Sequence, residues 1–108
     1  MWLASIRPTG RPHLVPLWFV WAGGCIYLCV MGSSVKVRNI VANPAVSLAL
    51  ESGAAPVVIE GHASLVATPW PEEAVRGFQQ KYDWTISTDT EYDVLVAVTP
   101  QRWLMVQQ

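Results

Sequence analysis

The sequence predicts a small, mainly β domain in which antiparallel strands are joined by tight turns and accompanied by two short helices. Its 108 residues, 52% of them hydrophobic, suit one domain with a substantial core. Short apolar runs alternate with turns rich in Gly and Pro, as is typical of antiparallel β structure. Only residues 34–42 and 72–82 place apolar side chains at helical spacing. We therefore expect a single α+β domain over residues 1–108.

The first part of the chain predicts three strands. Residues 2–7 form the first, and Pro8-Thr9-Gly10-Arg11 is a typical hairpin turn. Residues 13–21 form the second strand, and because this run lacks polar alternation we expect it to be buried on both faces. The Ala22-Gly23-Gly24 turn leads into a third strand over residues 25–31.

A short helix and a fourth strand follow. Ser34 is a suitable N-cap, and Val37, Ile40 and Val41 would share one helical face. Asn43-Pro44 ends the helix near Ala42, because proline cannot continue it. The fourth strand covers residues 46–50.

The second half predicts a loop at residues 52–56 and a fifth strand at 57–66. A helix follows over 72–82, with prolines before it and Glu72 and Glu73 at the positive end of its dipole. Its expected inner face consists of Ala74, Val75, Phe78 and Tyr82.

The last two predicted strands, residues 92–98 and 102–106, are divided by Thr99-Pro100-Gln101. The order of elements is therefore three strands, a helix, two strands, a helix and two strands.

The turn before the first helix carries the strongest candidate for a binding site. Ser33, Ser34, Lys36 and Arg38 bring two hydroxyls and two cations to a helix N-terminus, where unpaired N–H groups attract anions. Residues 1–50 contain no Asp or Glu. The pattern favours a small anionic ligand such as a phosphate, and the alternative is a solvated, capped helix start.

Other functional classes are disfavoured. With a net charge of −1 and a pI near 6.0, the chain lacks the basic stripe of a nucleic-acid-binding protein. No run reaches the roughly 18 apolar residues of a membrane helix and no signal peptide is evident, so we expect a cytoplasmic protein that does not bind membranes.

The cysteines and histidines do not predict a metal site or a disulfide. On a strand, Cys25 and Cys29 would lie about 13 Å apart, which is too far for a bridge, so we expect free, buried thiols. His13 and His62 fall in separate strand-like runs. We interpret His13 as a structural residue, and since no catalytic motif stands out, a cofactor would supply any chemistry.

Four segments taken together resemble the pyridoxamine 5′-phosphate oxidase-like family of split β-barrel flavoproteins. They are residues 7–13 (RPTGRPH), 15–19 (VPLWF), 34–44 (SVKVRNIVANP) and 60–63 (EGHA). The resemblance implies a six- to seven-stranded antiparallel split β-barrel and a homodimer with two flavin sites at its interface. It also implies FMN as cofactor or, in some branches of the family, the deazaflavin F420.

The resemblance assigns roles to individual residues. Ser34 and Lys36 match the element that holds the flavin phosphate, with Ser33 and Arg38 beside it. The flavin ring would be flanked by Pro16, Leu17 and Trp18, with Val30 and Met31 at the strand end before the phosphate turn. Trp103 lies near where the family closes the pocket, from the partner subunit.

Two departures leave the substrate open. Val35 stands where true pyridoxamine-phosphate oxidases have Arg, and their basic C-terminal segment has no counterpart before Gln108, so we do not expect that substrate. The leading hypothesis is an FMN-dependent oxidoreductase acting on an unknown small molecule. The alternatives are a non-enzymatic flavin carrier or sensor and an F420-dependent reductase.

Overall fold

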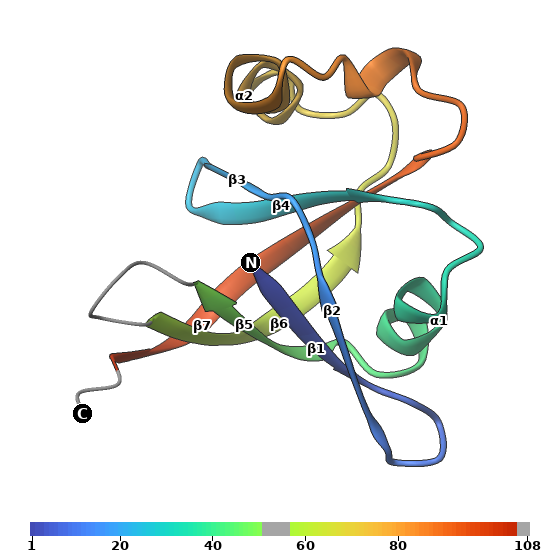
Figure 1. The fold of residues 1–108 in the computed structure, drawn as a ribbon, viewed down its shortest axis with the longest axis vertical. Helices are drawn as coiled ribbons and strands as arrows, with labels where there is room; N and C mark the ends of the chain where they lie inside the picture. Colours follow the sequence, from blue (N-terminus) through green and yellow to red (C-terminus); the bar gives the residue numbers. More distant parts are fainter. Residues whose placement is uncertain (51–56, 106–108) are drawn as a thin grey trace.

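The computed structural model describes residues 1–50 and 57–105, and all its strands belong to one curled antiparallel sheet (Figure 1). The strands occur in the order β2-β1-β5-β6-β7-β4-β3. Their bounds are β1 Trp2–Ile6, β2 Pro12–Pro16, β3 Val20–Ala22, β4 Cys25–Val30, β5 Ala45–Leu50, β6 Val57–Leu65 and β7 Val94–Met105. The helices are α1 Val35–Ala42, α2 Glu72–Tyr82 and the 3₁₀ turn η1 Ile86–Thr88. The predicted mainly β split barrel with two helices is confirmed.

The curl of the sheet follows from its connections. β2 and β3 are the two edge strands, yet only residues 17–19 separate them in the sequence. Because three residues cannot cross a flat sheet of seven strands, the two edges must come close together. In Figure 1 the chain rises along β2 and passes directly into β3 beside β4.

The prediction of a single strand at residues 13–21, buried on both faces, is wrong. The segment divides into β2 and β3, and side chains in β2 alternate between exposed and half-buried. Pro12 and Pro16 are the physical reason, since proline lacks the N–H that an interior strand needs and is confined to edges.

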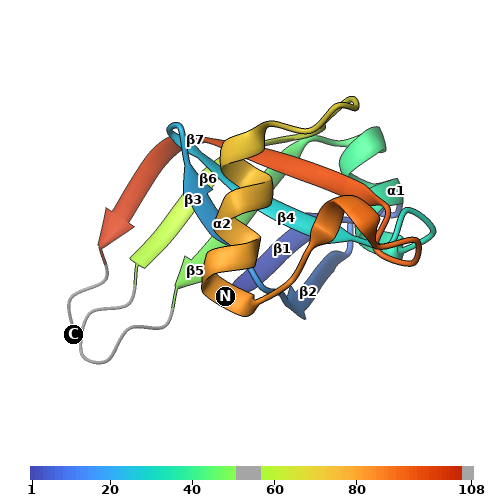
Figure 2. The same cartoon turned by 90° about the horizontal axis from the view of Figure 1, so that it is seen from above.

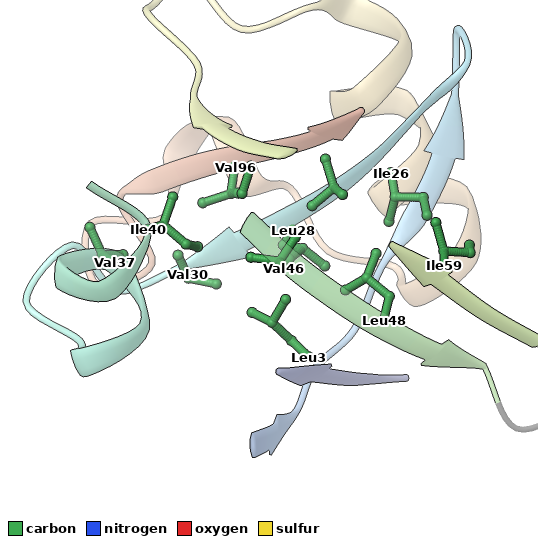
Figure 3. Close-up of a cluster of buried hydrophobic side chains, with 12 residues drawn as sticks. Leu3, Ile26, Leu28, Val30, Val37, Ile40, Val46, Leu48, Ile59 and Val96 are labelled. Carbon is green, nitrogen blue, oxygen red and sulfur yellow. The ribbon is translucent and has the colours of Figure 1, made fainter. Parts of the chain in front are cut away.

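Two hydrophobic clusters lie on opposite faces of β4. The barrel interior contains Leu3, Ile26, Leu28, Val30, Val37, Ile40, Val46, Leu48, Ile59, Ala63, Val96 and Val98 (Figure 3). The second cluster lies between the sheet and α2 and contains Val20, Tyr27, Cys29, Ala74, Phe78, Ile86, Leu95 and Ala97. Successive β4 side chains point to opposite faces, so β4 is buried on both sides, as its unbroken apolar run predicts.

The helices begin and end close to the predicted residues. α1 has Ser34 at its N-cap position and buries Val37, Asn39 and Ile40. Val41 is 68% exposed, so its expected place on the inner face is wrong. α2 lies across β3 on the outside of the barrel and fully buries Ala74 and Phe78 (Figure 2). Its Asp83 C-cap adopts the left-handed conformation.

The predicted break between two C-terminal strands is also wrong, because β7 runs continuously past Pro100. A bulge absorbs the proline: Glu60 pairs with Arg102 while Gly61 pairs with Pro100, which leaves Gln101 as the extra residue. The expected loop at residues 52–56 and the strand end at 106 lie outside the described residues.

We expect Gly61→Ala to destabilise the protein by about 1–3 kcal/mol, because an added Cβ would lie directly against the Thr99 carbonyl oxygen at the bulge. The free energy of unfolding in urea measures the change.

Gly77→Ala is the matched control. Its Cβ would meet only the Val20 side chain, at 3.2 Å or more, and Ala favours a helix over Gly by up to about 1 kcal/mol. Its net effect should be small. Similar losses in both variants would show that the crowding at Gly61 has no special importance.

Candidate functional site

The turn between β4 and α1 is fixed by backbone hydrogen bonds. Gly32 donates its N–H to Asp93 Oδ1 at 2.8 Å, and Ser34 donates its N–H to the Met31 carbonyl at 3.0 Å. Ser34 has extended backbone angles, and its carbonyl accepts the first helical bond from Arg38 at 3.4 Å. The loop before β7 therefore holds the start of α1 in place.

The Ser34 hydroxyl is buried at this turn without a partner. It makes no side-chain capping bond to α1, contrary to the usual behaviour of a serine at this position. Among the described residues, Ser34 Oγ and His13 Nδ1 are the buried side-chain N or O atoms that lack a hydrogen bond. Because an unsatisfied buried hydroxyl is unfavourable, Ser34 Oγ is suited to bind an oxygen of a ligand.

Lys36 adds a partly buried cation to the first turn of α1. Burial lowers the pKa of its ammonium group, since desolvation disfavours the charged form. The ion pairs found among residues 1–50 and 57–105 involve neither Lys36 nor Arg38. Arg38 and Ser33 are exposed. The turn thus carries a partly desolvated positive charge two residues after an unpartnered hydroxyl.

An open cleft of about 740 Å³ lies on the α2 side of the sheet. Three of the residues that the resemblance places beside a flavin ring line it: Pro16, Leu17 and Trp18. The remaining lining residues are Met1, Cys29, Tyr82, Asp83, Trp84, Asp89 and Tyr92. The cleft lies within the 300–1,000 Å³ range of small-molecule sites.

Aromatic contacts hold the cleft wall at residues 17–19. The Trp18 ring stacks on Tyr82 with centroids 4.4 Å apart, and Trp84 meets Trp18 edge-on at 5.9 Å. The Tyr82 hydroxyl accepts a bond from the Phe19 N–H at 3.0 Å and donates to the Phe19 carbonyl at 2.9 Å. The same carbonyl accepts from Lys81 Nζ at 2.9 Å. The C-terminal end of α2 thus fixes the connection between β2 and β3.

Asp89 organises the opposite wall. Its carboxylate accepts bonds from Trp84 Nε1 at 2.9 Å and from the backbone N–H groups of Glu91 and Tyr92 at 2.9 and 2.8 Å. These bonds, the Tyr92 N–H first, lower the pKa of Asp89. The group is therefore a fixed negative charge rather than a proton donor.

Cys29 lines the cleft as a buried thiol, and Cys25 is also free, as predicted. The prediction that Cys25 is buried is wrong, since it is only half-buried. The Cys29 Sγ donates to the Tyr92 carbonyl at 3.3 Å. Burial, with smaller contributions from Asp89 and Asp93, raises its pKa to about 12. Cys29 is therefore protonated at neutral pH and is a poor nucleophile.

The cleft and the turn adjoin each other at the end of β4. Cys29 lines the cleft and Ser34 follows it by five residues, a span of at most about 18 Å. Val30 lies between them with its side chain in the core, and Met31 is exposed. A ligand with a ring at one end and a phosphate at the other can therefore contact both features.

Trp103 is not brought to this cleft within the protomer. It lies on β7 opposite Ile59, is 51% exposed, and meets Trp21 edge-on at 5.4 Å.

The sequence did not identify four of the cleft residues as site residues: Tyr82, Trp84, Asp89 and Tyr92. The aromatic spacing of 82, 84 and 92 was visible, but nothing in it indicated that the segment folds over Trp18.

The part of the chain that the structure describes shows neither a metal-binding cluster nor a membrane-spanning helix. It contains no group of three or more His, Cys, Asp or Glu side chains arranged to hold a metal ion. Neither α1 nor α2 is long and apolar enough to span a membrane.

Comparisons with known proteins support a shared fold. A family model described as pyridoxamine 5′-phosphate oxidase matches residues 1–107. No curated protein is similar enough in sequence to match the chain.

Several solved structures are similar. A conserved hypothetical protein from Mycobacterium tuberculosis is 28% identical with a TM-score of 0.76, covering 98% of this chain and 75% of its own. An F420 reductase is 24% identical with a TM-score of 0.78, covering 95% and 86%. HutZ, the heme storage protein of Vibrio cholerae, is 19% identical with a TM-score of 0.81, covering 95% and 82%. At these identities the last two show the fold alone.

We expect Tyr82→Phe to destabilise the protein by about 1–3 kcal/mol, because the partly buried Phe19 N–H loses its acceptor while the Phe19 carbonyl keeps Lys81. Urea unfolding measures the loss. Tyr92→Phe is the control, since the Tyr92 hydroxyl has no hydrogen bond to another described residue, and it should change stability less. Equal effects would show that the two bonds at Phe19 do not hold the 17–19 connection.

Proposed function

The chain belongs to the pyridoxamine 5′-phosphate oxidase family, and from this premise we propose that it binds FMN and acts as a flavin-dependent oxidoreductase. The observation that carries the proposal is the buried, unpartnered Ser34 hydroxyl beside Lys36 at the start of α1. A phosphate would accept a hydrogen bond from the hydroxyl and neutralise the cation. Both groups are unfavourably placed without such an anion.

The remaining residues of the turn fit the same role. Ser33 and Arg38 are exposed and can reach a phosphate from the solvent side. Lys36 is the stronger candidate of the two cations, since it lies in the first helical turn and is partly desolvated. The helix N-terminus adds its unpaired N–H groups.

The cleft would receive the flavin ring along its Pro16, Leu17 and Trp18 side, with the backbone near Val30 and Met31 on the path to the phosphate. When bound, a flavin supplies hydride or electron transfer by its own ring chemistry. The chain would position the ring, exclude water with its aromatic walls and bind the phosphate. We assign no catalytic side chain, since Cys29 is protonated and Asp89 is fixed by three hydrogen bonds.

The fold does not decide the cofactor, since the similar structures include an F420 reductase and a heme storage protein. F420 also carries a phosphate and is the second candidate. The visible absorbance spectrum of the purified protein and competition between FMN and F420 distinguish the two. A flavin carrier or sensor is distinguished from an oxidoreductase by whether bound, reduced flavin passes electrons to an acceptor faster than free FMN does.

We further propose a homodimer that completes the site. Leu14, Trp18, Trp21 and Trp103 are each more than half exposed, which is a large amount of apolar surface for a small domain. The strand β4 contributes no surface to such a dimer, because α2 covers its outer face within the protomer. Trp103 would approach a flavin only in the partner's cleft.

Lys36→Ala is expected to weaken FMN binding about 10- to 150-fold, because it removes a charge-assisted hydrogen bond worth roughly 1.5–3 kcal/mol. Riboflavin, which lacks the phosphate, should bind the wild-type protein and the variant equally. Fluorescence titration measures both affinities. The stability of the cofactor-free protein should not fall, because the substitution removes a charge that burial disfavours.

Arg38→Ala is the matched control and should have a smaller effect, since Arg38 is exposed and screened by solvent. Equal losses for FMN and riboflavin in Lys36→Ala would show that the turn is only a helix start and does not bind the phosphate.

Light scattering at micromolar concentration should give twice the mass of the 11.9 kDa chain. Trp103→Ser, which removes exposed apolar area on β7, should shift the mass toward the monomer. A monomeric mass for the wild-type protein, with its fold intact by circular dichroism, would contradict the dimer.

A further inference from the structure

The cleft has a chemical character different from that of the phosphate turn. Four of its lining residues are aromatic and two carry carboxylates, whereas no Lys or Arg side chain lines it. The aromatic residues are Trp18, Tyr82, Trp84 and Tyr92, and the carboxylates are Asp83 and Asp89. Aromatic faces carry negative electrostatic potential, so the aromatic walls and the carboxylates both attract positively charged ligands.

Lys81 adjoins the cleft but does not line it. Its Nζ lies 3.5 Å from the centre of the Phe19 ring and donates to the Phe19 carbonyl. Both partners are neutral, so the ammonium group keeps its charge. The same Nζ lies 5.2 Å from the centre of the Tyr82 ring, so one of the cleft aromatics already contacts a cation.

Both carboxylates are held in fixed positions. Asp83 closes α2 in the left-handed conformation, and its Oδ1 accepts a bond from Gln79 Nε2 at 2.8 Å. Asp89 is fixed by Trp84 and two backbone N–H groups, and its lowered pKa keeps it ionised across the neutral range. The ion pairs found among the described residues involve neither carboxylate.

We propose that this cleft binds a planar organic cation, of the class of an N-alkylated heteroaromatic ring. Such a ring gains from stacking on Trp18, with the Trp84 ring edge-on beside it, and from the charge of Asp83 and Asp89, whereas a neutral ring gains only the stacking and an anion is repelled. The inference deepens the proposed function and rests on it in one respect: the flavin ring would lie along the Pro16, Leu17 and Trp18 side of the same cleft, so the cation would be its neighbour at Trp18.

The test uses the cofactor-free protein and three probes that share a pyridine ring but differ in charge. These are 1-methylnicotinamide, nicotinamide and nicotinate, titrated by calorimetry. We expect the cation to bind roughly 3- to 30-fold more tightly than the neutral amide, with nicotinate weakest. A cation that binds no more tightly than nicotinamide would overturn the inference.

Two pairs of variants locate the binding site. Trp18→Leu should lose most of the cation affinity, while Trp21→Leu should keep it. The two side chains are similarly exposed, at 57% and 51%, but only Trp18 lines the cleft.

The second pair tests the charge. Asp83→Asn should reduce the preference for the cation about threefold, because Asn tolerates the left-handed conformation and keeps the acceptor for Gln79. Glu91→Gln, which makes the same change of charge outside the cleft lining, should have no effect. Equal losses in the two members of either pair would place the cation elsewhere.

Lys36→Ala separates this inference from the proposed function. The variant should bind the cation as the wild-type protein does, because Lys36 does not line the cleft. Loss of FMN binding without loss of cation binding supports two distinct subsites. If the wild-type protein binds FMN through Lys36 but shows no preference for the cation, only the inference about the cation fails.

Discussion

The short connection between β2 and β3 is the constraint on which the rest of the structure depends. These strands form opposite edges of one sheet, so the three residues between them force the sheet to close on itself. The connection is tied at both ends: Leu17 donates its N–H to the Met1 carbonyl at 2.8 Å, and Phe19 is bound by Tyr82 and Lys81 from α2. Because Trp18 lies between these anchors, the closure of the barrel also positions the aromatic wall of the cleft.

β4 connects this closure to the binding turn. Its side chains alternate between the barrel interior and the α2 cluster, so neither face is free to move independently. Cys29 and Gly32, at and just beyond its end, are bonded to Tyr92 and Asp93 of the same loop. The two parts of the candidate site are therefore fixed by one strand and one loop, which is the arrangement that a rigid, elongated ligand with two different ends requires.

Local patterns in the sequence predicted most of the fold, and they failed where long-range packing decided the outcome. Helix ends at Ala42 and Tyr82 followed from Pro44 and from the spacing of Ala74 and Phe78, which are local signals. The strand at 13–21 failed because hydrophobic content alone does not reveal that a chain crosses between two sheet edges. The break at Pro100 failed because a bulge at Gln101 of β7, formed against Glu60 and Gly61 of β6 some forty residues earlier in the chain, absorbs the proline. The turn that we propose as the phosphate site stood out in the sequence because its hydroxyls and cations are adjacent along the chain. The acidic and aromatic wall did not, since residues 82–92 meet Trp18 only in the folded chain.

The two halves of the site have opposite electrostatic character, and this follows from the separation of charge along the sequence. Every acidic residue comes after position 50, and the acids of the cleft arrive with α2 and the loop after it, while the cations of the turn precede position 40. Folding brings the two halves side by side at the end of β4 without an ion pair between Lys36 and either cleft carboxylate. Mutual neutralisation of these charges would have left neither half able to select a ligand. Their separation instead keeps the proposed anion site at the turn apart from the proposed cation site in the cleft, so two neighbouring ligands could each be recognised by charge as well as by shape.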